Sequence, residues 1–338
     1  MLSFSVIIDV SIYIVKKRKD LFMNKRKRRL GDRSDGWRLR GIDPYDAVSP
    51  YIMVERSDAQ NYFIDKFELT EAEKYVKAKR EQGMKDFTIM HVILAAYIRM
   101  LSQKPYINRF LSGQKVYARN SIQINMAVKE ELRSDKTNTV IKAYFEPTDT
   151  AEDVYRKFTD TYNAAFAGGE NAFDSVARIL NYIPGVIKKF VVWFLKLLDY
   201  FGLLPKGLLN VSPFHGLMFI TSMGSLGIPP IYHHLYNFGN VPVFIAFGTK
   251  RHVCELDLDG NPVRRKYIDY TAVVDERICD GFAYASAFKV LRRCLNNPWV
   301  LDNPPETVFE DMDIDKKKKP KKEKKSKKKK GDSNEENV

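Results

Sequence analysis

The chain has 338 residues, 44% of them hydrophobic and 12% aromatic, which is the composition of a folded protein and excludes a largely disordered one. Its formal net charge of +14 lies at the two ends, because residues 1–40 and 316–338 each carry +8 and residues 41–315 are left with −2. The near-neutral middle argues against a specific nucleic-acid site, which needs clustered basic residues, so the basic ends are expected to be solvated segments.

Residues 1–44 are expected to form a basic N-terminal arm. Its apolar stretch LSFSVIIDVSIYIV contains Asp9 and is only 14 residues long, which is short for a bilayer span. The basic sequence KKRKD follows this stretch instead of preceding it, unlike a signal peptide. Met23 is an alternative start, in which case residues 1–22 are not translated. The folded domain is then expected over residues 45–303.

The first part of the domain predicts strands and helices in turn. Residues 61–83 have the pattern of a strand followed by a helix, with Thr70 as N-cap, and residues 87–105 form an almost wholly apolar helix that we expect to be buried. The segments SIQINMAVKE and NTVIKAYFEP alternate apolar and polar residues and predict paired strands. Residues 150–168 predict a further helix.

Residues 183–205, IPGVIKKFVVWFLKLLDYFGLLP, are long and apolar. Three lysines and Asp199 inside this segment make it costly to span a bilayer. Two interpretations remain open: a helix wedged in the core or in a subunit interface, and a helix lying on a membrane surface.

The last part of the domain is rich in strands. Residues 216–252 predict a strand, a glycine-rich bend and a second strand, and RKYIDYTAVVDER predicts the last strand, after a turn at LDLDGNPV. Together with the preceding helices, this order predicts an α/β fold in layers on a mostly strand-paired sheet. Residues 304–338 form a Lys-rich tail that we expect to be disordered.

Four short motifs, KPYINRFL, SIQINMAVKE, FITSMGSLG and DERICDG, occur in this order. They resemble segments of the catalytic domain of the dihydrolipoamide acyltransferases of 2-oxoacid dehydrogenase complexes, whose fold includes chloramphenicol acetyltransferase. The resemblance covers roughly residues 50–300. It implies a two-layer α/β sandwich of the chloramphenicol-acetyltransferase type, with a mixed sheet covered by helices, and a homotrimer with active sites between subunits.

Acyl transfer needs a base that deprotonates the acceptor and a donor that stabilises the tetrahedral oxyanion. The resemblance places the oxyanion hydroxyl on Thr221, with Ser222 and Gly224 as neighbouring substrate-binding residues. In the family a histidine at the start of DERICDG is the base, but Glu276 stands at that position here. A carboxylate acts as a base where burial raises its pKa. His233 and His234, in PPIYHHLYNFG, are alternative bases.

The rest of DERICDG is expected to shape the site. The resemblance implies that Asp280 orients the turn by pairing with an arginine, for which Arg56 and Arg40 are the candidates. Gly281 is expected to permit a sharp bend. Arg277 lies in the same turn and would oppose any rise in the pKa of Glu276.

The donor is expected to be a soluble thioester such as acyl-CoA, because no segment resembles a lipoyl domain. Its phosphates would meet Lys250, Arg251, Arg264 or Arg265. We expect no bound cofactor and no metal, since the three cysteines lie at unrelated spacings without a Cys/His cluster, as suits a reducing cytoplasm. Two other functions stay open: a degenerate binding or scaffold protein that has lost the base, and a membrane-peripheral module directed by residues 183–205 and the basic ends.

Overall fold

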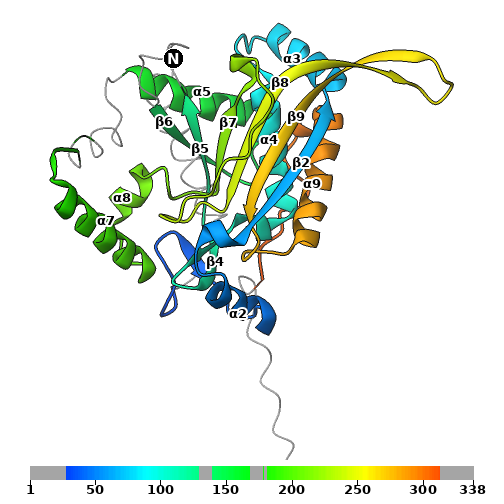
Figure 1. Ribbon diagram of the computed structural model, residues 1–338. Helices are drawn as coiled ribbons and strands as arrows, with labels where there is room; N and C mark the ends of the chain where they lie inside the picture. Colours follow the sequence, from blue (N-terminus) through cyan, green and yellow to red (C-terminus); the bar gives the residue numbers. More distant parts are fainter. Residues whose placement is uncertain (1–27, 129–138, 168–177, 179–180, 313–338) are drawn as a thin grey trace, which may run out of the picture.

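The computed structural model describes residues 28–128, 139–167, 178 and 181–312. At its centre is a six-stranded sheet in the order β2-β9-β8-β7-β5-β6 (Figure 1). The strands are β2 (Gln60–Glu68), β5 (Ile122–Val128), β6 (Thr139–Phe145), β7 (Met218–Ser222), β8 (Val243–Leu256) and β9 (Pro262–Asp275). Strand β7 runs parallel to β5 and β8, and the other neighbours are antiparallel. The sheet is therefore mixed.

Four helices cover one face of this sheet: α3 (Thr70–Glu81), α4 (Ile89–Gln103), α5 (Ala151–Ala167) and α9 (Gly281–Asn296). Helix α4 is the predicted buried helix, and the side chains of Val92, Leu94 and Ile98 on it are fully buried. The predicted α/β layers are confirmed, and β5, β7 and β9, which the motifs assigned to one sheet, do share it. The predicted N-cap is wrong, because Leu69 occupies the cap position and Thr70 begins the helix.

Part of the predicted N-terminal arm is folded. Strand β1 (Gly36–Arg38) joins β4 (Lys115–Arg119) and β3 (Arg109–Ser112) in a small antiparallel sheet, and α2 (Pro44–Ile52) follows, capped by the Asp43 carboxylate. The pairing of β1 with β4 explains this difference, since it satisfies backbone groups that an extended arm would leave to water.

The predicted tail also begins later than residue 304. Asp311 forms an ion pair of 2.6 Å with Arg109, and the Phe309 N–H donates to the Ser102 carbonyl over 2.8 Å. These contacts hold the chain on the body through residue 312. The Lys-rich sequence that follows, residues 1–27 and the turn expected between β5 and β6 lie outside the described residues.

The second face of the sheet is crossed by the irregular segment 228–241. Its Leu235 and Val241 pack against Phe219 and Phe244 of the sheet. The segment approaches β8 so closely that a Cβ atom on Gly248 would lie 2.4 Å from Pro230 Cδ. Glycine is therefore required at 248, because any side chain there would push the segment off the sheet.

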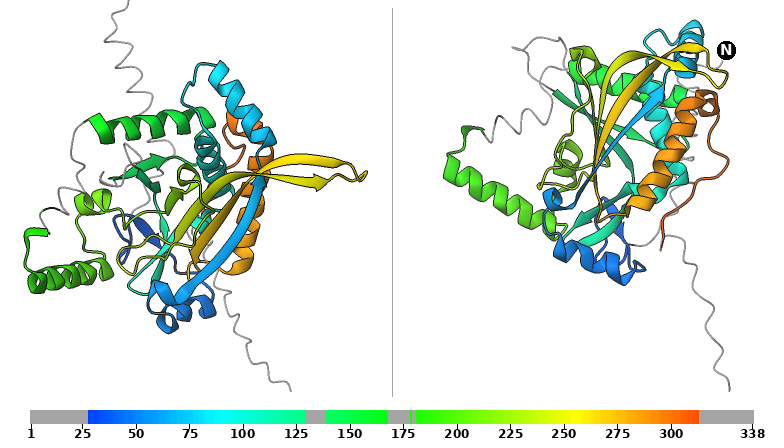
Figure 2. Two further views of the ribbon diagram at one scale, coloured as in Figure 1. Left: turned by 45° about the horizontal axis from the view of Figure 1, so that its top comes forward. Right: turned by 45° about the vertical axis from the view of Figure 1, so that its right-hand side comes forward.

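Helix α7 (Gly185–Tyr200) lies apart from the sheet and its covering helices, at the lower left of Figure 1 and again in both views of Figure 2. The short α8 (Lys206–Val211) follows it. Asp199 is the only buried residue of α7, so the prediction of a helix wedged in the core of the chain is wrong. Its exposed apolar side chains include those of Val186, Ile187, Phe190, Trp193, Phe194 and Leu197. Among the described residues, no helix has the length and hydropathy to cross a membrane.

His91, near the start of α4, is surrounded by aromatic rings. Its ring centroid lies 5.3 Å from that of Phe87 and 5.2 Å from that of Tyr155. Its Nδ1 accepts a hydrogen bond of 3.0 Å from the Thr88 backbone N–H, which caps the N-terminus of the helix. Burial in this cluster lowers the pKa of His91 to about 4, against the weaker attraction of Asp86.

We therefore expect the free energy of unfolding to decrease by about 3 kcal/mol as the pH is lowered from about 6.5 to about 4. In this window the unfolded chain binds the His91 proton and the folded chain does not, so protonation favours unfolding. Urea unfolding of the wild type and of His91→Phe at pH 7, 5.5 and 4.5 measures the difference. Equal pH dependence in the two proteins would contradict the assignment.

Candidate functional site

A cavity of about 940 Å³ opens where β7 ends beside the middle of β8, on the helix-covered side of the sheet. Its walls come from α3, the start of α4 and the bend that follows β7. Ser222, Ser225 and Thr88 contribute hydroxyl groups, and Ile93 and Phe247 contribute apolar surface. A mostly apolar hollow with a few convergent polar groups has the size and character of a small-molecule site.

The bend after β7 gives the cavity its floor. It continues into a short 3₁₀ helix, Gly224–Leu226, and the Met223 N–H donates to the Phe247 carbonyl over 2.7 Å. A Cβ on Gly224 would come within 3.3 Å of the Gly248 carbonyl oxygen, so glycine lets the bend lie close to β8. Ser222 and Gly224, the predicted substrate-binding residues, both line this cavity.

Charged residues at the cavity are largely paired. Glu73 accepts hydrogen bonds of 2.8 Å from Lys250 and from Lys266. Burial raises the pKa of this carboxyl, but the two lysines outweigh that effect and hold it below its usual value. Of the four basic residues predicted to meet phosphates, Lys250 alone is among the residues lining this cavity.

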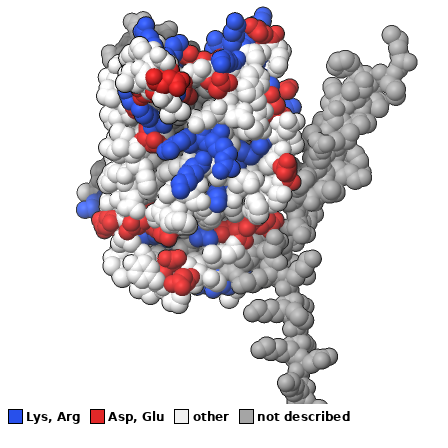
Figure 3. Space-filling model, turned by 90° about the vertical axis from the view of Figure 1, so that its right-hand side faces the viewer, with Lys and Arg blue, Asp and Glu red and all other residues white. Residues whose placement is uncertain are grey.

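The other predicted phosphate-binding residues lie on the long β8–β9 hairpin. Arg251 pairs with Asp269, and Arg265 pairs with Glu68. Figure 3 shows Lys and Arg gathered in the middle of the side of the molecule that carries α9, with acidic side chains above and below them. This cluster of Lys and Arg side chains is therefore bordered by Asp and Glu side chains.

Thr221 faces away from the cavity. Side chains alternate along a strand, so Thr221 shares the second face of the sheet with Phe219, whereas Ser222 points to the helix side. Thr221 is 9% exposed, and it is in register with Ala246 of β8, which is in register with Thr271 of β9. The Thr271 hydroxyl donates to the Ile231 carbonyl over 2.7 Å, so the crossing segment passes over this row of residues.

His233 lies on the same face as Thr221. Its ring is stacked on Phe244 with 4.2 Å between centroids, and Phe244 is two residues from Ala246 along β8. Burial, with a smaller contribution from His234, lowers the pKa of His233 and favours the neutral imidazole. Its Nε2 atom is buried and has no hydrogen-bond partner within the described part of the chain. His234 is exposed and contacts Tyr236 edge-on at 5.1 Å.

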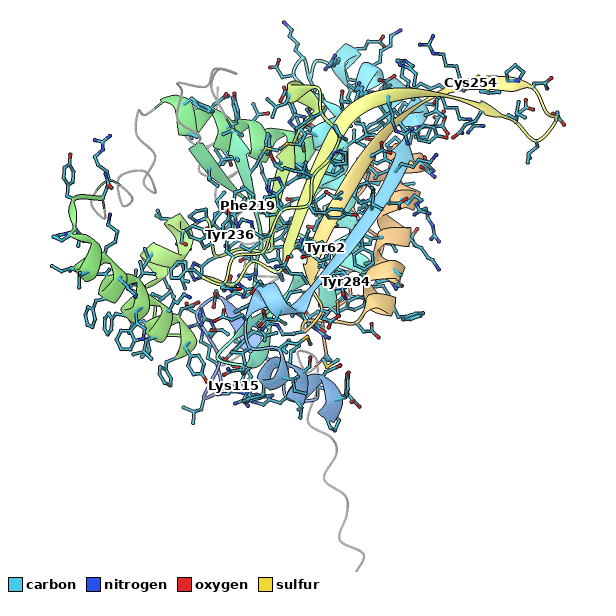
Figure 4. The ribbon with its side chains drawn as sticks, in the orientation of Figure 1. Tyr62, Lys115, Phe219, Tyr236, Cys254 and Tyr284 are labelled. Carbon is cyan, nitrogen blue, oxygen red and sulfur yellow. The ribbon has the colours of Figure 1, made fainter. Side chains whose placement is uncertain are left out.

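The turn after β9 is organised by Asp275, which is fully buried between two arginines. Arg277 binds both carboxylate oxygens, at 2.8 and 2.7 Å, and Arg56 lies 3.3 Å from Oδ2. In Figure 4, Tyr62 and Tyr284 lie toward this turn, and the Tyr284 hydroxyl donates to the Asp275 carbonyl over 3.1 Å. Phe219 of β7 packs beneath the crossing segment, to which Tyr236 belongs (Figure 4).

The predicted ion pair between Asp280 and an arginine of the arm is wrong. Asp280 is the N-cap of α9, and its carboxylate accepts the Ala283 N–H over 2.8 Å. Arg56 reaches Asp275 instead, and Arg40 pairs with Asp32 at 3.3 Å. The physical reason is burial: Asp275 has no contact with water and needs cationic partners, whereas Asp280 is exposed.

The predicted requirement for Gly281 is not supported. Its φ is not in the left-handed region, and a Cβ there would meet nothing within 4 Å. Gly281 is simply the first residue of α9, a position that other residues can occupy. Neighbouring Cys279 is buried, and burial raises the pKa of its thiol to about 12, which favours the neutral thiol over the thiolate.

Glu276 is half-buried and does not meet Thr221 within one chain. Its Oε2 accepts a hydrogen bond of 2.7 Å from Asn61, and its N–H donates to the Ala59 carbonyl. It lies five residues beyond Thr271, which shares a row with Thr221. At about 3.3 Å per residue, this separation is about 16 Å along the strand. The predicted site residues therefore lie in three separate places. Ser222 and Gly224 line the cavity, Thr221 and His233 lie on the second face of the sheet, and Glu276 lies in the turn after β9.

Comparison with known proteins finds similarity to solved structures at low sequence identity. No protein-family model and no curated protein sequence matches the chain. A probable dihydrolipoamide acetyltransferase from Listeria monocytogenes is 14% identical with a TM-score of 0.47, covering 76% of this chain and 94% of that chain. A catalytic core of the 2-oxoacid dehydrogenase complex from Thermoplasma acidophilum is 13% identical with a TM-score of 0.46, covering 77% and 98%. Chloramphenicol acetyltransferase is 12% identical with a TM-score of 0.42, covering 76% and 99%.

At these identities the similarity is one of fold. The described residues contain no group of three or more His, Cys, Asp or Glu side chains that could hold a metal ion. Sequence reasoning did not identify Asp275 as the centre of the turn. The available signal was an acid at the end of an apolar strand with an arginine two residues later, since a buried carboxylate needs such a partner.

We expect Asp275→Ala to lower the free energy of unfolding by about 3–5 kcal/mol, because it leaves two buried guanidinium groups without their counter-ion. Asp280→Ala removes only a helix cap and should cost about 1 kcal/mol. Chemical denaturation of both variants at pH 7 measures the two effects. A larger loss for Asp280→Ala than for Asp275→Ala would contradict this assignment.

Proposed function

We propose that this protein is an acyltransferase that moves an acyl group from a coenzyme A thioester to a small acceptor. The proposal rests on the two neighbouring residues at the end of β7, whose side chains face opposite sides of the sheet. Ser222 borders the large cavity, and the next residue back, Thr221, lies on the second face together with the neutral His233. A base and a hydroxyl donor on the second face of the sheet are two of the parts that acyl transfer requires, and the cavity on the helix side has the size of a small-molecule site.

In the proposed reaction, the His233 imidazole takes the proton of the acceptor as the acceptor attacks the thioester carbonyl. The tetrahedral intermediate carries its negative charge on the former carbonyl oxygen, to which the Thr221 hydroxyl donates a hydrogen bond. The carbon–sulfur bond then breaks, and the coenzyme A thiolate leaves and receives the proton from His233. The low pKa of His233 suits a base that is unprotonated at neutral pH.

Glu276 is the alternative base, and it would act on Thr221 of another subunit. The motif resemblance supports this arrangement, because it implies a trimer with sites between subunits. The exposed apolar side chains of α7 offer a surface for such an association. Three free cysteine thiols suit a reducing cytoplasm, which we propose as the location.

We expect thioester turnover to fall about 10²–10⁴-fold in His233→Gln, which removes the base, and about 10²–10³-fold in Thr221→Ala, which removes the oxyanion donor. His234→Gln is the matched control and should retain activity, because His234 is exposed and points to Tyr236. A panel of acyl-CoA thioesters, assayed by release of the free thiol, gives the rates.

The same panel separates the alternatives. Loss of turnover in Glu276→Gln with activity kept in His233→Gln would assign the base to Glu276. Absence of turnover with every thioester, in a protein that is folded by circular dichroism, would reject the enzyme in favour of the scaffold function.

We expect sedimentation at micromolar concentration to give a trimer, and the double substitution Phe190→Glu/Trp193→Glu to dissociate it. Both side chains are more than half exposed in the single chain, so charge there should disrupt an interface without unfolding the monomer. Lys188→Gln/Lys189→Gln, which also lowers the net charge by two, controls for the charge change. A monomer that floats with liposomes would contradict the trimer and support the membrane-peripheral function.

A further inference from the structure

A second pocket lies at the opposite end of the sheet from the large cavity. It has a volume of about 310 Å³ and is lined by residues at the start of β5, such as Gln123, by Lys206 of α8 and by Arg119 at the end of β4. The large cavity is bordered by the carboxyl end of β7 and the middle of β8, whereas this pocket lies where β5 begins. The two spaces are therefore distinct.

Arg119 is the central feature of this pocket. It is 6% exposed, and it forms no ion pair with a carboxylate of the described residues. Its Nη2 donates to the side-chain and backbone oxygens of Asn240, at 3.0 and 3.2 Å, and its guanidinium carbon lies 4.2 Å from the Phe110 ring centroid. Its Nε atom is buried and has no hydrogen-bond partner in the part of the chain that the structure describes.

The neighbouring acids are already neutralised by another arginine. Arg33 binds Asp35 at 2.8 Å and Asp199 at 2.8 Å. Asp35, which also lines the pocket, accepts a hydrogen bond from Asn240. Although Asp35 attracts Arg119 from a greater distance, burial dominates and lowers the pKa of Arg119 to about 10.

Further cationic groups surround the pocket. Lys142 donates to the Leu209 and Ser212 carbonyls next to it, and burial together with Arg119 lowers the pKa of Lys142 to about 7. Lys206 and Arg28 lie at the pocket lining and are exposed. The two buried arginines balance the two buried carboxylates, and further positive charge beside the pocket comes from the partly buried Lys142 and the exposed Lys206 and Arg28.

We propose that this pocket binds a phosphate group. A buried guanidinium with an unused N–H and no paired carboxylate is costly unless an anion neutralises it. Phosphate matches the planar donor set of arginine, and the exposed Lys206 and Arg28 supply the second charge that a dianion requires. The Ser121 hydroxyl and the Asn120 amide, also in the lining, provide neutral hydrogen-bonding groups.

The test is calorimetric titration of the full-length protein with inorganic phosphate and, separately, with coenzyme A, at constant ionic strength set by chloride. We expect saturable binding, weakened at least tenfold in Arg119→Met and in the surface variant Lys206→Gln. Arg156→Gln is the matched control, because Arg156 lies on α5, away from the pocket, and pairs with Asp153, and it should bind as the wild type does.

Dependence on Arg119 and Lys206 with inorganic phosphate assigns the pocket to free phosphate, and the same dependence with coenzyme A alone assigns it to the phosphates of that molecule. Equal affinity in Lys206→Gln and the wild type, or no binding of either probe above the chloride background, would overturn the proposal. Lys206→Gln decides the question even if Arg119→Met does not fold, since Lys206 is exposed. Thioester turnover is a separate readout, so failure of this pocket and failure of the acyl-transfer proposal are distinguishable.

Discussion

The buried carboxylate of Asp275 holds together several segments that are far apart in the chain. Arg277 grips both of its oxygens and also donates to the Met53 and Val54 carbonyls at the end of α2. Arg56 approaches from the other side and binds the Tyr236 and Gly239 carbonyls of the crossing segment. One ion cluster thereby fixes the end of β9, the start of β2 and the segment that covers the second face. The side chains of Asp275, Arg56 and Arg277 are all buried. Removal of any one of them therefore leaves a buried charge without its partner, which destabilises the fold.

The crossing segment in turn determines which surfaces of the sheet remain usable. It is held at one end by Arg56 and at the other by its contact with Gly248, and between them it carries His233 over Phe244. Any chemistry on the Thr221 face therefore depends on a segment whose position is set by an ion cluster some distance away. The cavity on the helix side is independent of this segment, since it is enclosed by α3, α4 and the bend after β7.

Two polar networks at different ends of the sheet solve the same physical problem in different ways. Around Asp275 an acid is enclosed by cations, and every charge has a partner within the chain. The guanidinium group of Arg119 is also buried, but the neighbouring acids Asp35 and Asp199 form their ion pairs with Arg33 instead. The first arrangement is complete as a structural element, whereas the second has capacity left for an anion. This difference is why the first is interpreted as scaffold and the second as a binding site.

The sequence by itself determined the order and type of most elements. Alternation predicted β5 and β6, and apolar character predicted the burial of α4, because these features depend on local periodicity and composition. The sheet shared by β5, β7 and β9 was implied by the resemblance of the motifs, not by local pattern. The sequence could not determine which acid Arg56 binds, since Asp275 and Asp280 are five residues apart and only burial distinguishes them. Nor could it show that α7 lies outside the core, because an apolar helix has the same pattern in a core and on an exposed surface. Tertiary structure alone decided which of the two neighbours, Thr221 or Ser222, faces the cavity and that Arg33 takes both acids near Arg119. These outcomes depend on contacts between residues far apart in the chain, for which local sequence carries no signal.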